Sequence, residues 1–369
     1  MSDEKLTTIY SQHTIHVQRV GATEGLKVIP YLESIENDVV SILNKYRKRK
    51  VTTALQIKIQ GEIDAATRKH LQDYTSQLKV ENRALGAYEA EFAATALNGV
   101  VINDDFNATV PSAAAVNSVA IITPIKLSEN SYSSYSSMMK NYWGKWSDEI
   151  HGVVQAGFLE GSTIPEITSA ITAQMDLSKS GTTKSVLDRA RRSAKQLAIT
   201  GTNHYANTAR IAFVDKNDDI LKGYRFLAVN DSRTSRTCAR LDQTTYLKDD
   251  PKLSSVTPPL HPNCRSALTF DVDDRFKLDP AETKKASSFN VDGKRDPKPI
   301  DSDSIYYENL KKLNARDQDA AIGPTLGKAL RQMDAAKFAK MTGDSMNNPL
   351  TIKQMKQKNN ELGRILRSQ

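Results

Sequence analysis

The two cysteines of this 369-residue chain share one short segment with a histidine and several charged residues. His261 follows Cys238 by 23 positions, and Cys264 follows His261 by three. Thiolate sulfur and imidazole nitrogen are both zinc ligands. Prolines on either side of His261 make the local backbone stiff and largely non-helical. We therefore expect residues 231–266 to form one compact unit, which is either a ligand site or a structural staple.

Several chemistries remain open for this segment. A closed structural zinc site needs four ligands, so Asp231, Asp242 or a water molecule would have to complete it. The main alternative is a structural pair formed by Cys238 and Cys264, as buried thiols or as a disulfide, which requires Cα atoms within about 7 Å. Catalysis by a Cys–His pair would need an exposed thiol of low pKa. The proline after His261 suits a structural turn better than a proton shuttle.

No established catalytic motif accompanies the segment. The chain contains no Walker loop, no GxSxG and no HExxH sequence. We therefore predict that the protein is not an enzyme. A metal-dependent hydrolase or nuclease that uses the Cys/His motif is the alternative.

Positive charge suggests an anionic partner. The net charge is +8 and the isoelectric point is near 9.2, which favours nucleic acid, although a solvated basic surface would look the same. The densest basic run gives four candidate phosphate contacts, Arg47, Lys48, Arg49 and Lys50. A second group comprises Lys184, Arg189, Arg191, Arg192 and Lys195. Neither resembles a base-reading module, so any DNA contact should be to phosphates and non-specific.

Composition limits the class of protein further. Hydrophobic residues make up 39% and charged residues 25% of the chain, as is typical of a soluble protein. No stretch of about 18 apolar residues exists, so no membrane helix is expected. The first residues are polar and contain no apolar signal region, which argues against secretion. Two cysteines exclude a disulfide-rich scaffold and fit a reducing cytoplasm.

Apolar periodicity predicts helices over most of the chain. Within residues 30–97 the spacing of three or four indicates two or three long helices, and it resumes near Met138. Thr163 and Glu166 are spaced as a capping box. A further helix is predicted from about 185 to 214, with a kink or break at Gly201. Residues 119–122 are read as a short strand or a packed loop.

The period changes to two after residue 222. Tyr224, Phe226 and Ala228 alternate with their neighbours, as do Leu268, Phe270 and Val272, so two strands should enclose the motif. The predicted fold is mainly α with a small α+β portion: long N-terminal helices, a small antiparallel sheet carrying the Cys/His motif, and a helical C-terminal tail. The predicted divisions are an N-terminal arm (1–29), a helical domain (30–183), a helix plus small sheet (184–278), a linker (279–303) and the tail (304–369).

The motif residues resemble a known family. The order Asp231-x-Arg-Thr-x-x-x-Cys238-x-x-Leu-Asp242, followed by Pro258-Pro-x-His-Pro-Asn-Cys-Arg265, is similar to the phage head morphogenesis family, whose members are minor head proteins similar to the F protein of phage Mu. In this resemblance the motif scaffold is formed by Asp231, Arg233, Thr234, Asp242, Pro259, Pro262 and Arg265. Features of the tail, such as Tyr306-Tyr-x-x-Leu310, extend the resemblance to about residues 185–355.

The chain departs from the family's cysteine pattern at two positions. Many members have Cys where this chain has Ser235 and Ser266, which gives them a four-cysteine arrangement near the histidine. This chain keeps Cys238, His261 and Cys264 as the candidate metal ligands. Zinc is therefore a candidate cofactor here. The resemblance does not extend to the family's four-cysteine arrangement.

The resemblance implies a virion protein. Family members are present in few copies, associate with the portal vertex and assist head assembly or the fate of DNA during ejection. The expected partners are the portal protein, the scaffold and major capsid proteins, and packaged double-stranded DNA, with no membrane. The expected location is the capsid interior or portal vertex, after synthesis in the host cytoplasm. A free DNA-binding protein is a third reading.

Overall fold

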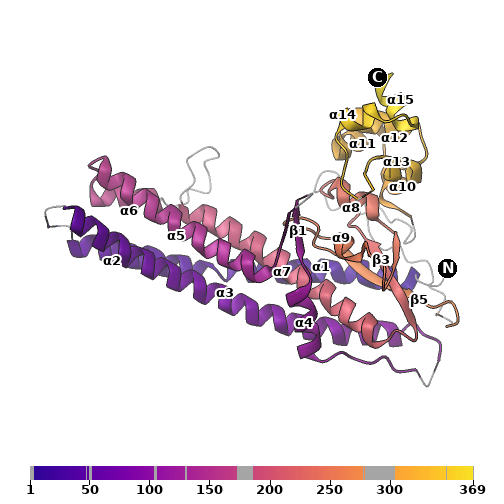
Figure 1. Ribbon diagram of the computed structural model, residues 1–369, viewed down its shortest axis with the longest axis horizontal. Helices are drawn as coiled ribbons and strands as arrows, with labels where there is room; N and C mark the ends of the chain where they lie inside the picture. The colour runs from indigo at the N-terminus through magenta and orange to yellow at the C-terminus, as the bar shows by residue number, and fades with distance from the viewer. Residues whose placement is uncertain are drawn as a thin grey trace. The chain divides into compact units, whose positions relative to one another are not determined.

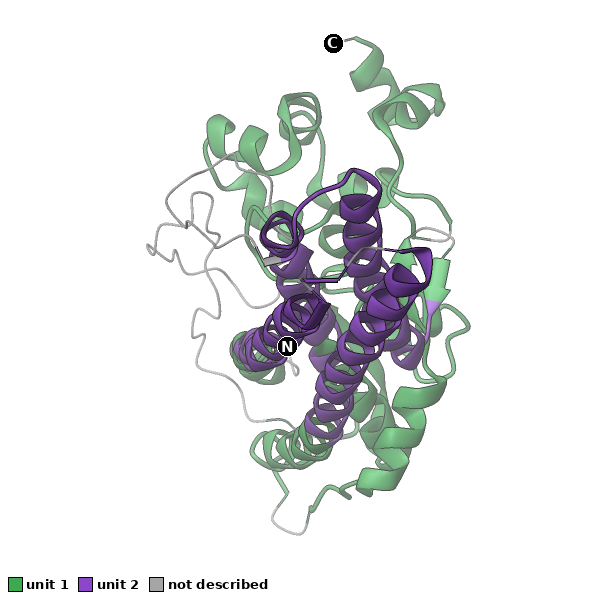
Figure 2. Cartoon of the chain, turned by 90° about the vertical axis from the view of Figure 1, so that its left-hand side faces the viewer, with its two compact units in different colours: residues 1–18, 84–132, 203–369 green, residues 19–83, 133–202 purple. Residues whose placement is uncertain are grey.

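Helices make up most of the chain in the computed structural model (Figure 1). The structure describes residues 4–46, 48–49, 52–103, 106–128, 131–172, 186–276, 278, 304–345 and 347–368. Two compact units divide the chain (Figure 2): unit 1 comprises residues 1–18, 84–132 and 203–369, and unit 2 comprises 19–83 and 133–202. The helices α1 (Glu4–Leu26), α3 (Thr53–Asn98) and α7 (Val186–Lys216) contribute residues to both units.

Unit 2 is built mainly of helices in its described residues. Besides its shares of α1, α3 and α7, it contains α2 (Ile29–Tyr46), α5 (Tyr135–Leu159) and α6 (Ile164–Thr172). The predicted apolar stripes are buried, including Leu32, Ile35, Val39 and Leu43 of α2. The prediction of two or three long helices within residues 30–97 is therefore confirmed, and the helices are two, α2 and α3.

Helix α6 begins with the predicted capping box. The backbone N–H of Thr163 donates to Oε2 of Glu166 at 2.6 Å, and the N–H of Glu166 donates to the Thr163 hydroxyl at 3.4 Å. This reciprocal pair is a capping box, which satisfies donors that the first turn of a helix leaves without partners. The capping prediction is confirmed.

Helix α7 is continuous through Gly201, so the predicted kink or break there is wrong. A Cβ at Gly201 would lie 2.1 Å from the ring of Tyr135. The hydroxyl of Tyr135 donates to the carbonyl of Leu197 at 3.3 Å, one turn earlier in α7. Gly201 thus serves close packing between α5 and α7, and packing outweighs the low helix propensity of glycine.

Unit 1 contains the sheet that carries the motif. Its strands are β3 (Leu221–Leu227), β4 (Thr245–Leu247) and β5 (Ala267–Val272), in the order β4-β3-β5 with antiparallel pairing. In register, Tyr224 lies opposite Tyr246 on one side and Phe270 on the other. The two predicted strands are confirmed as β3 and β5, and β4 is a third strand. The short helices α8 (Arg236–Leu241) and α9 (Leu253–Val256) complete the connection.

Aromatic side chains build the core of unit 1. Tyr10 of α1 meets Phe270 of β5 edge to face, with ring centroids 5.3 Å apart, and Phe213 of α7 stacks on Phe270 at 5.1 Å. All three are fully buried. Burying an aromatic or large aliphatic side chain contributes about 1.5–3 kcal/mol, so this core ties α1 and α7 to the sheet.

Residues 119–122, read from sequence as a strand or loop, belong to a helix instead. Helix α4 spans Ala113–Ile122 and begins at Ser112, whose hydroxyl accepts the N–H of Ala115. The N-cap serine and three following alanines favour a helix strongly enough to outweigh the β-branched residues near its end. A separate two-stranded sheet follows, formed by β1 (Ile125–Ser128) and β2 (Ser131–Ser133), which the sequence reading did not foresee.

Residues 304–368, termed the C-terminal module, are helical in short pieces as predicted. The helices are α10 (Tyr306–Lys311), α11 (Ala315–Ile322), α12 (Pro324–Arg331), α13 (Ala335–Met341), α14 (Ile352–Gln357) and α15 (Glu361–Arg367). Gly323 adopts a φ of 85° and separates α11 from α12, and Pro324 begins α12. The module has its own apolar cluster, in which Tyr307 and Phe338 pack edge to face.

The predicted fold class is confirmed: mainly helical, with small sheets and a helical C-terminal region. The predicted linker 279–303 lies outside the described residues. The structure describes a helix within the predicted arm 1–29, and the proposed domain boundaries stay a prediction. Among the described residues, no helix is long and apolar enough to span a membrane.

Candidate functional site

The thiol and imidazole groups of the motif meet in unit 1. Cys238 lies on α8, and its N–H donates to the hydroxyl of Ser235, the N-cap of that helix. His261 and Cys264 belong to the turn before β5, which the N–H of Cys264 closes on the carbonyl of His261. The two sulfur atoms are 3.7 Å apart, and Sγ of Cys238 is 3.4 Å from Nε2 of His261. We refer to Cys238, His261 and Cys264 as the Cys/His cluster.

The predicted proximity of Cys238 and Cys264 is confirmed. The structure also excludes one of the alternatives, the disulfide. Both thiols are free and buried, so the disulfide alternative does not describe this structure. A structural thiol pair and a metal site remain. The donor atoms of the three residues all lie within 4.8 Å of one another, as one metal ion would require.

The donor distances fit a tetrahedral zinc ion. Zinc–sulfur bonds of about 2.3 Å and a zinc–nitrogen bond of about 2.0 Å imply a sulfur–sulfur edge of about 3.8 Å and a sulfur–nitrogen edge of about 3.5 Å. The observed separations of 3.7 and 3.4 Å are close to these edges. Two of the three edges of the cluster therefore match those of a tetrahedral zinc site.

The orientation of His261 suits the same purpose. Its Nδ1 lies 3.0 Å from the carbonyl oxygen of Pro262, and because a carbonyl only accepts, Nδ1 carries the proton. Nε2 then presents its lone pair to the cluster, where the Ser235 hydroxyl donates to it at 2.9 Å. Zinc-binding histidines usually make such a bond through their other nitrogen. Pro262 thus contributes the carbonyl that sets the tautomer.

The two thiols are electrostatically unequal. The hydrogen bond to Cys264 and burial both raise the pKa of Cys238 well above that of an ordinary thiol. Burial also opposes ionisation of Cys264, but its interactions with Cys238 and His261 outweigh that effect and lower the pKa of Cys264. Burial lowers the pKa of His261, and its interaction with Cys264 outweighs that effect and raises it. The cluster therefore favours a thiolate at Cys264, which is the form that binds metal.

The carboxylates expected to complete a metal site lie elsewhere. Asp231 forms a two-pronged ion pair with Arg265, with contacts of 2.5 and 2.6 Å. Oδ1 of Asp242 accepts the N–H of Ala228 at 2.8 Å, and burial raises the pKa of this carboxyl to about 7. Neither joins the cluster among the described residues. The hydroxyl of Ser235 occupies the nearest position instead.

The remaining scaffold residues shape the turn that precedes α8. Oδ1 of Asp231 accepts the N–H of Arg233 at 2.9 Å, and the hydroxyl of Thr234 donates to the carbonyl of Val229. These bonds form a local side-chain turn of the kind that aspartate favours. Pro259 follows Pro258 through a cis peptide bond at the start of the second half-motif. The scaffold residues therefore act on backbone conformation.

A small pocket opens beside the cluster. Its volume is about 220 Å³ including open solvent, and it is lined by Val229, Arg233, Thr234, Ser235, Cys238, His261, Asn263, Arg265 and Ser266. Ligand pockets usually enclose about 300–1,000 Å³ and are mainly apolar, whereas this pocket is smaller and polar. Cys264 is fully buried and does not line it. A nucleophilic role for the thiol of lowered pKa therefore lacks access to substrate.

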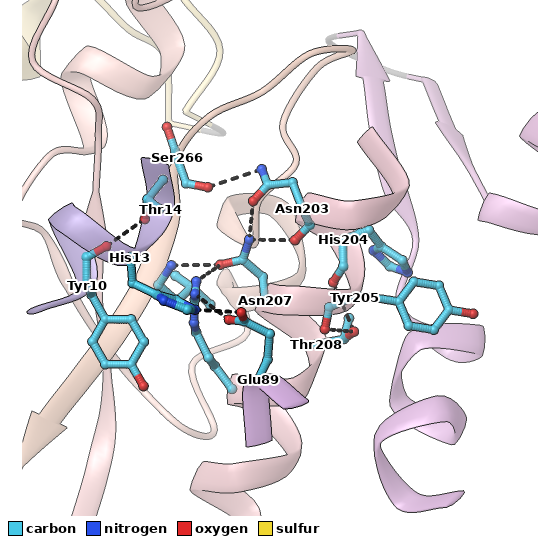
Figure 3. A network of polar contacts seen from close by, with 12 residues as sticks. Tyr10, His13, Thr14, Glu89, Asn203, His204, Tyr205, Asn207, Thr208 and Ser266 are labelled. Carbon is cyan, nitrogen blue, oxygen red and sulfur yellow. Dashed lines mark hydrogen bonds and ion pairs between the residues drawn. The ribbon is translucent and has the colours of Figure 1, made fainter. Parts of the chain in front are cut away.

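Two asparagines of α7 hold the second half-motif in place (Figure 3). Nδ2 of Asn203 donates to the carbonyls of Cys264 and Ser266 at 2.9 and 3.1 Å. Oδ1 of Asn207 accepts the N–H of Leu268, the second residue of β5, at 2.7 Å. Nδ2 of Asn207 in turn donates to Asn203. These bonds satisfy the backbone where the loop enters β5, so they fix the position of Cys264.

An ion pair continues this network toward α1 and α3 (Figure 3). Nη1 of Arg210 donates to Asn207, and its Nη2 donates to Glu89 of α3 at 2.9 Å. Nε2 of His13 donates to the other oxygen of Glu89 at 2.6 Å. Arg210 and Glu89 are almost fully buried. The sequence reading missed this network, although the polar residues at 203, 207 and 210 recur at helical spacing and would have indicated it.

The face of α8 that carries two arginines holds the C-terminal module. Nη1 of Arg236 donates to the carbonyl of Leu350 at 3.1 Å. Arg240 donates to the carbonyls of Ala339 and Asn347, both at 3.0 Å. A Cβ at Gly343 would lie 1.8 Å from the guanidinium carbon of Arg240, so the glycine makes room for that group. Helix α8 thus connects the Cys/His cluster to the module.

The basic groups identified from sequence are described only in part. Lys48 and Arg49 are exposed, whereas Arg47, Lys50 and Lys184 lie outside the described residues. In the second group, Arg189 pairs with Glu149 and Arg192 pairs with Asp188, each at 2.6 Å. Acidic neighbours therefore neutralise part of the second group.

The fold and the cluster define a class: a helix-plus-small-sheet protein in which two buried thiols meet a partly exposed imidazole. Residues 148–269 match the family described as Phage Mu protein F like protein. This range contains both half-motifs, so the resemblance to the phage head morphogenesis family is confirmed for this segment. The family is one of structural head proteins. No curated protein and no solved structure matches the chain.

Proposed function

We propose that the protein is a minor head protein of a tailed phage, associated with the portal vertex, that assists head assembly and the packaging and ejection of DNA. The observation that carries this proposal is the family match across both half-motifs. The burial of Cys238 and Cys264 supports a structural role for the motif. The proposed location is the virion, at the capsid interior or portal vertex, after assembly in the host cytoplasm.

The proposed partners follow from the same role. The portal protein is the principal one, with the scaffold and major capsid proteins as further partners during assembly. Packaged double-stranded DNA is a non-specific partner, for which the net charge of +8 is the support. The exposed cations Lys48 and Arg49 belong to the run proposed to contact phosphates.

Within this function, the Cys/His cluster acts as a structural joint. It fastens α8 to the turn before β5, and Arg236 and Arg240 on α8 hold the C-terminal module. Cys238, His261 and Cys264 would hold a zinc ion, which would cross-link these two segments when bound. Ser235, which bonds Nε2 of His261, stands nearest as the fourth group.

The metal-dependent hydrolase remains the second candidate function. It is favoured by one observation, the pocket next to a cluster with only three strong ligands. Catalytic zinc sites also have three protein ligands and one open position. Against it, the described lining of the pocket contains no carboxylate that could act as a general base.

Replacing Ser235 by Cys tests the joint directly. The variant supplies a fourth ligand and a third sulfur donor, so zinc should raise the melting temperature of Ser235→Cys more than that of the wild type. Ser112→Cys is the matched control, because Ser112 also caps a helix but lies far from the cluster in sequence and contact. If zinc changes the melting temperatures of both variants equally, the cluster does not bind zinc.

Portal association is tested by co-expression with the portal protein of the same phage, followed by size-exclusion chromatography and sedimentation. The proposal predicts that the chain elutes and sediments with the portal ring. Separation of the two proteins at all tested salt concentrations would contradict the proposed role. A DNA-hydrolysis assay on the same preparation distinguishes the second candidate.

A further inference from the structure

The positive charge of the protein is concentrated near the C-terminus. Residues 304–369 hold 12 of the 51 Lys and Arg residues but only 6 of the 43 Asp and Glu residues. Their net charge of +6 is therefore most of the +8 carried by the whole chain. This distribution differs from that expected of a surface with evenly mixed charges.

Two helices at the end of the module carry the densest part of this charge. We call α14 and α15 the basic hairpin; it contains Lys353, Lys356, Lys358, Arg364 and Arg367, all of which are exposed. On the opposite faces, Met355, Leu362 and Leu366 are buried in the module core. The apolar faces therefore fix the hairpin, and the basic faces point to solvent.

A close helix–helix approach brings these cations together. The guanidinium of Arg367 donates to the carbonyls of Lys356 and Lys358, the second at 3.1 Å. A Cβ at Gly363 would lie 2.1 Å from the carbonyl oxygen of Lys358. Gly363 thus lets α15 approach the end of α14, and Arg367 joins the two lysines on one edge.

This charge is poorly neutralised within the described chain. No ion pair there involves Lys353, Lys356, Lys358 or Arg364. Glu361, the only acidic residue of the hairpin, approaches Lys337 at 3.8 Å. By contrast, Lys45 beside the other basic run pairs with Glu62 at 3.0 Å. The hairpin therefore presents a concentrated positive field to a partner.

We propose that the basic hairpin binds the phosphate backbone of double-stranded nucleic acid without reading its sequence. Protein interfaces are usually centred on apolar and aromatic side chains, whereas Ile352 is the only large exposed apolar residue in the described part of the module. Closely spaced Lys and Arg residues on a helical surface are suited to phosphates. The inference deepens the proposed DNA contact, on which it rests, and assigns it to a surface.

The test uses the full chain and a triple variant, Lys353→Gln, Lys356→Gln and Lys358→Gln. Binding to two unrelated DNA duplexes is measured by fluorescence anisotropy at several salt concentrations. Each lost phosphate contact should reduce the slope of log affinity against log salt by about 0.9, so the triple variant should lose about 2–3 units of slope and at least about tenfold in affinity at low salt. The matched control neutralises the exposed Lys58, Lys69 and Lys140 of unit 2.

The inference is supported if the hairpin variant loses affinity equally for both duplexes, keeps the wild-type melting temperature, and the control variant binds like wild type. It is overturned if the hairpin variant binds as the wild type does, or if Lys48→Gln with Arg49→Gln removes the salt dependence instead. If the wild-type protein binds the portal but not DNA, the inference about the hairpin is overturned and the proposed function is not. Binding to an acidic polypeptide but not to DNA would assign the surface to a protein partner.

Discussion

Asn207 shows how one side chain can set the position of the motif. Its amide oxygen accepts the backbone N–H of Leu268 and a guanidinium N–H of Arg210, and its amide nitrogen binds Asn203. All of these groups are buried. A buried donor that loses its partner destabilises a protein more than the hydrogen bond itself contributes.

We therefore expect Asn207→Ala to lower the free energy of unfolding by about 2–4 kcal/mol, because two buried donors lose their acceptor. Chemical denaturation measures the change. Thr208→Ala is the control, since the Thr208 hydroxyl binds only carbonyls of its own helix, and its loss should be about 1 kcal/mol. Equal losses in the two variants would show that Asn207 has no special role in holding β5.

Asp242 should give the protein a measurable pH dependence. Burial raises the pKa of its carboxyl to about 7, above the value of about 4 expected in the unfolded chain. The folded state then binds more protons than the unfolded state between these values, so this group's contribution to stability falls as the pH rises from about 4 to about 7.

Asp242→Asn keeps an oxygen that can accept the N–H of Ala228 and removes the charge. The melting temperature of the variant relative to wild type should therefore increase as the pH is raised from about 4 to about 7, and then stay constant. Asp249→Asn, at an exposed position of the same connection, should show no such trend. A difference that does not change with pH would contradict the raised pKa.

At the scale of elements, α8 is the piece on which the Cys/His cluster and the C-terminal module both depend. Its first turn carries the cap at Ser235 and the thiol of Cys238, and its arginines reach the carbonyls of the module. A six-residue helix has little stability of its own. Its position must therefore come from these tertiary contacts.

Gly343→Ala should loosen the module, because the new methyl group would overlap the guanidinium of Arg240. We expect a loss of about 1–3 kcal/mol, as is usual for overpacking. Hydrogen exchange measured by mass spectrometry should show faster exchange in α13 and α14.

Gly144→Ala is the matched control for this experiment. Gly144 lies within α5, and a Cβ there would have open space around it. The control should stabilise the protein by about 0.5–1 kcal/mol through helix propensity. Unchanged exchange of the module in Gly343→Ala would show that Arg240 does not anchor it.

The same scale shows which parts of the structure could be predicted. Apolar periodicity was sufficient for α2 and α3, because each buries one continuous stripe. It failed at residues 119–122, where β-branched residues indicated a strand and the N-cap at Ser112 determined a helix. Glycine's low helix propensity was misleading at Gly201, since the packing of Tyr135 against that glycine is a tertiary contact with no local signal.

For the site, sequence order was sufficient to bring Cys238, His261 and Cys264 together, because two strands of one small sheet enclose them. It was not sufficient to choose the partners of Asp231 and Asp242, which bind Arg265 and a backbone N–H instead of a metal. Those choices depend on side-chain orientation, which spacing along the chain does not define.

At the scale of the whole molecule, separate parts of the chain have separate tasks. The Cys/His cluster and the asparagines of α7 hold the small sheet and α8, and α8 holds the module that carries most of the net charge. The segment 148–269 is similar to the family described as Phage Mu protein F like protein. Portal association and the DNA-binding hairpin are proposals that extend this assignment.

The most direct test of the structural role is to measure portal capture per folded molecule for wild type and Cys264→Ser. The variant removes a fully buried sulfur from the cluster, so its melting temperature should fall by several degrees. We predict that immobilised portal rings capture the wild type. They should capture the variant in proportion to its folded fraction, and neither protein should hydrolyse DNA. Wild type that is not captured, or a fully folded variant that loses a hydrolytic activity present in the wild type, would contradict this prediction.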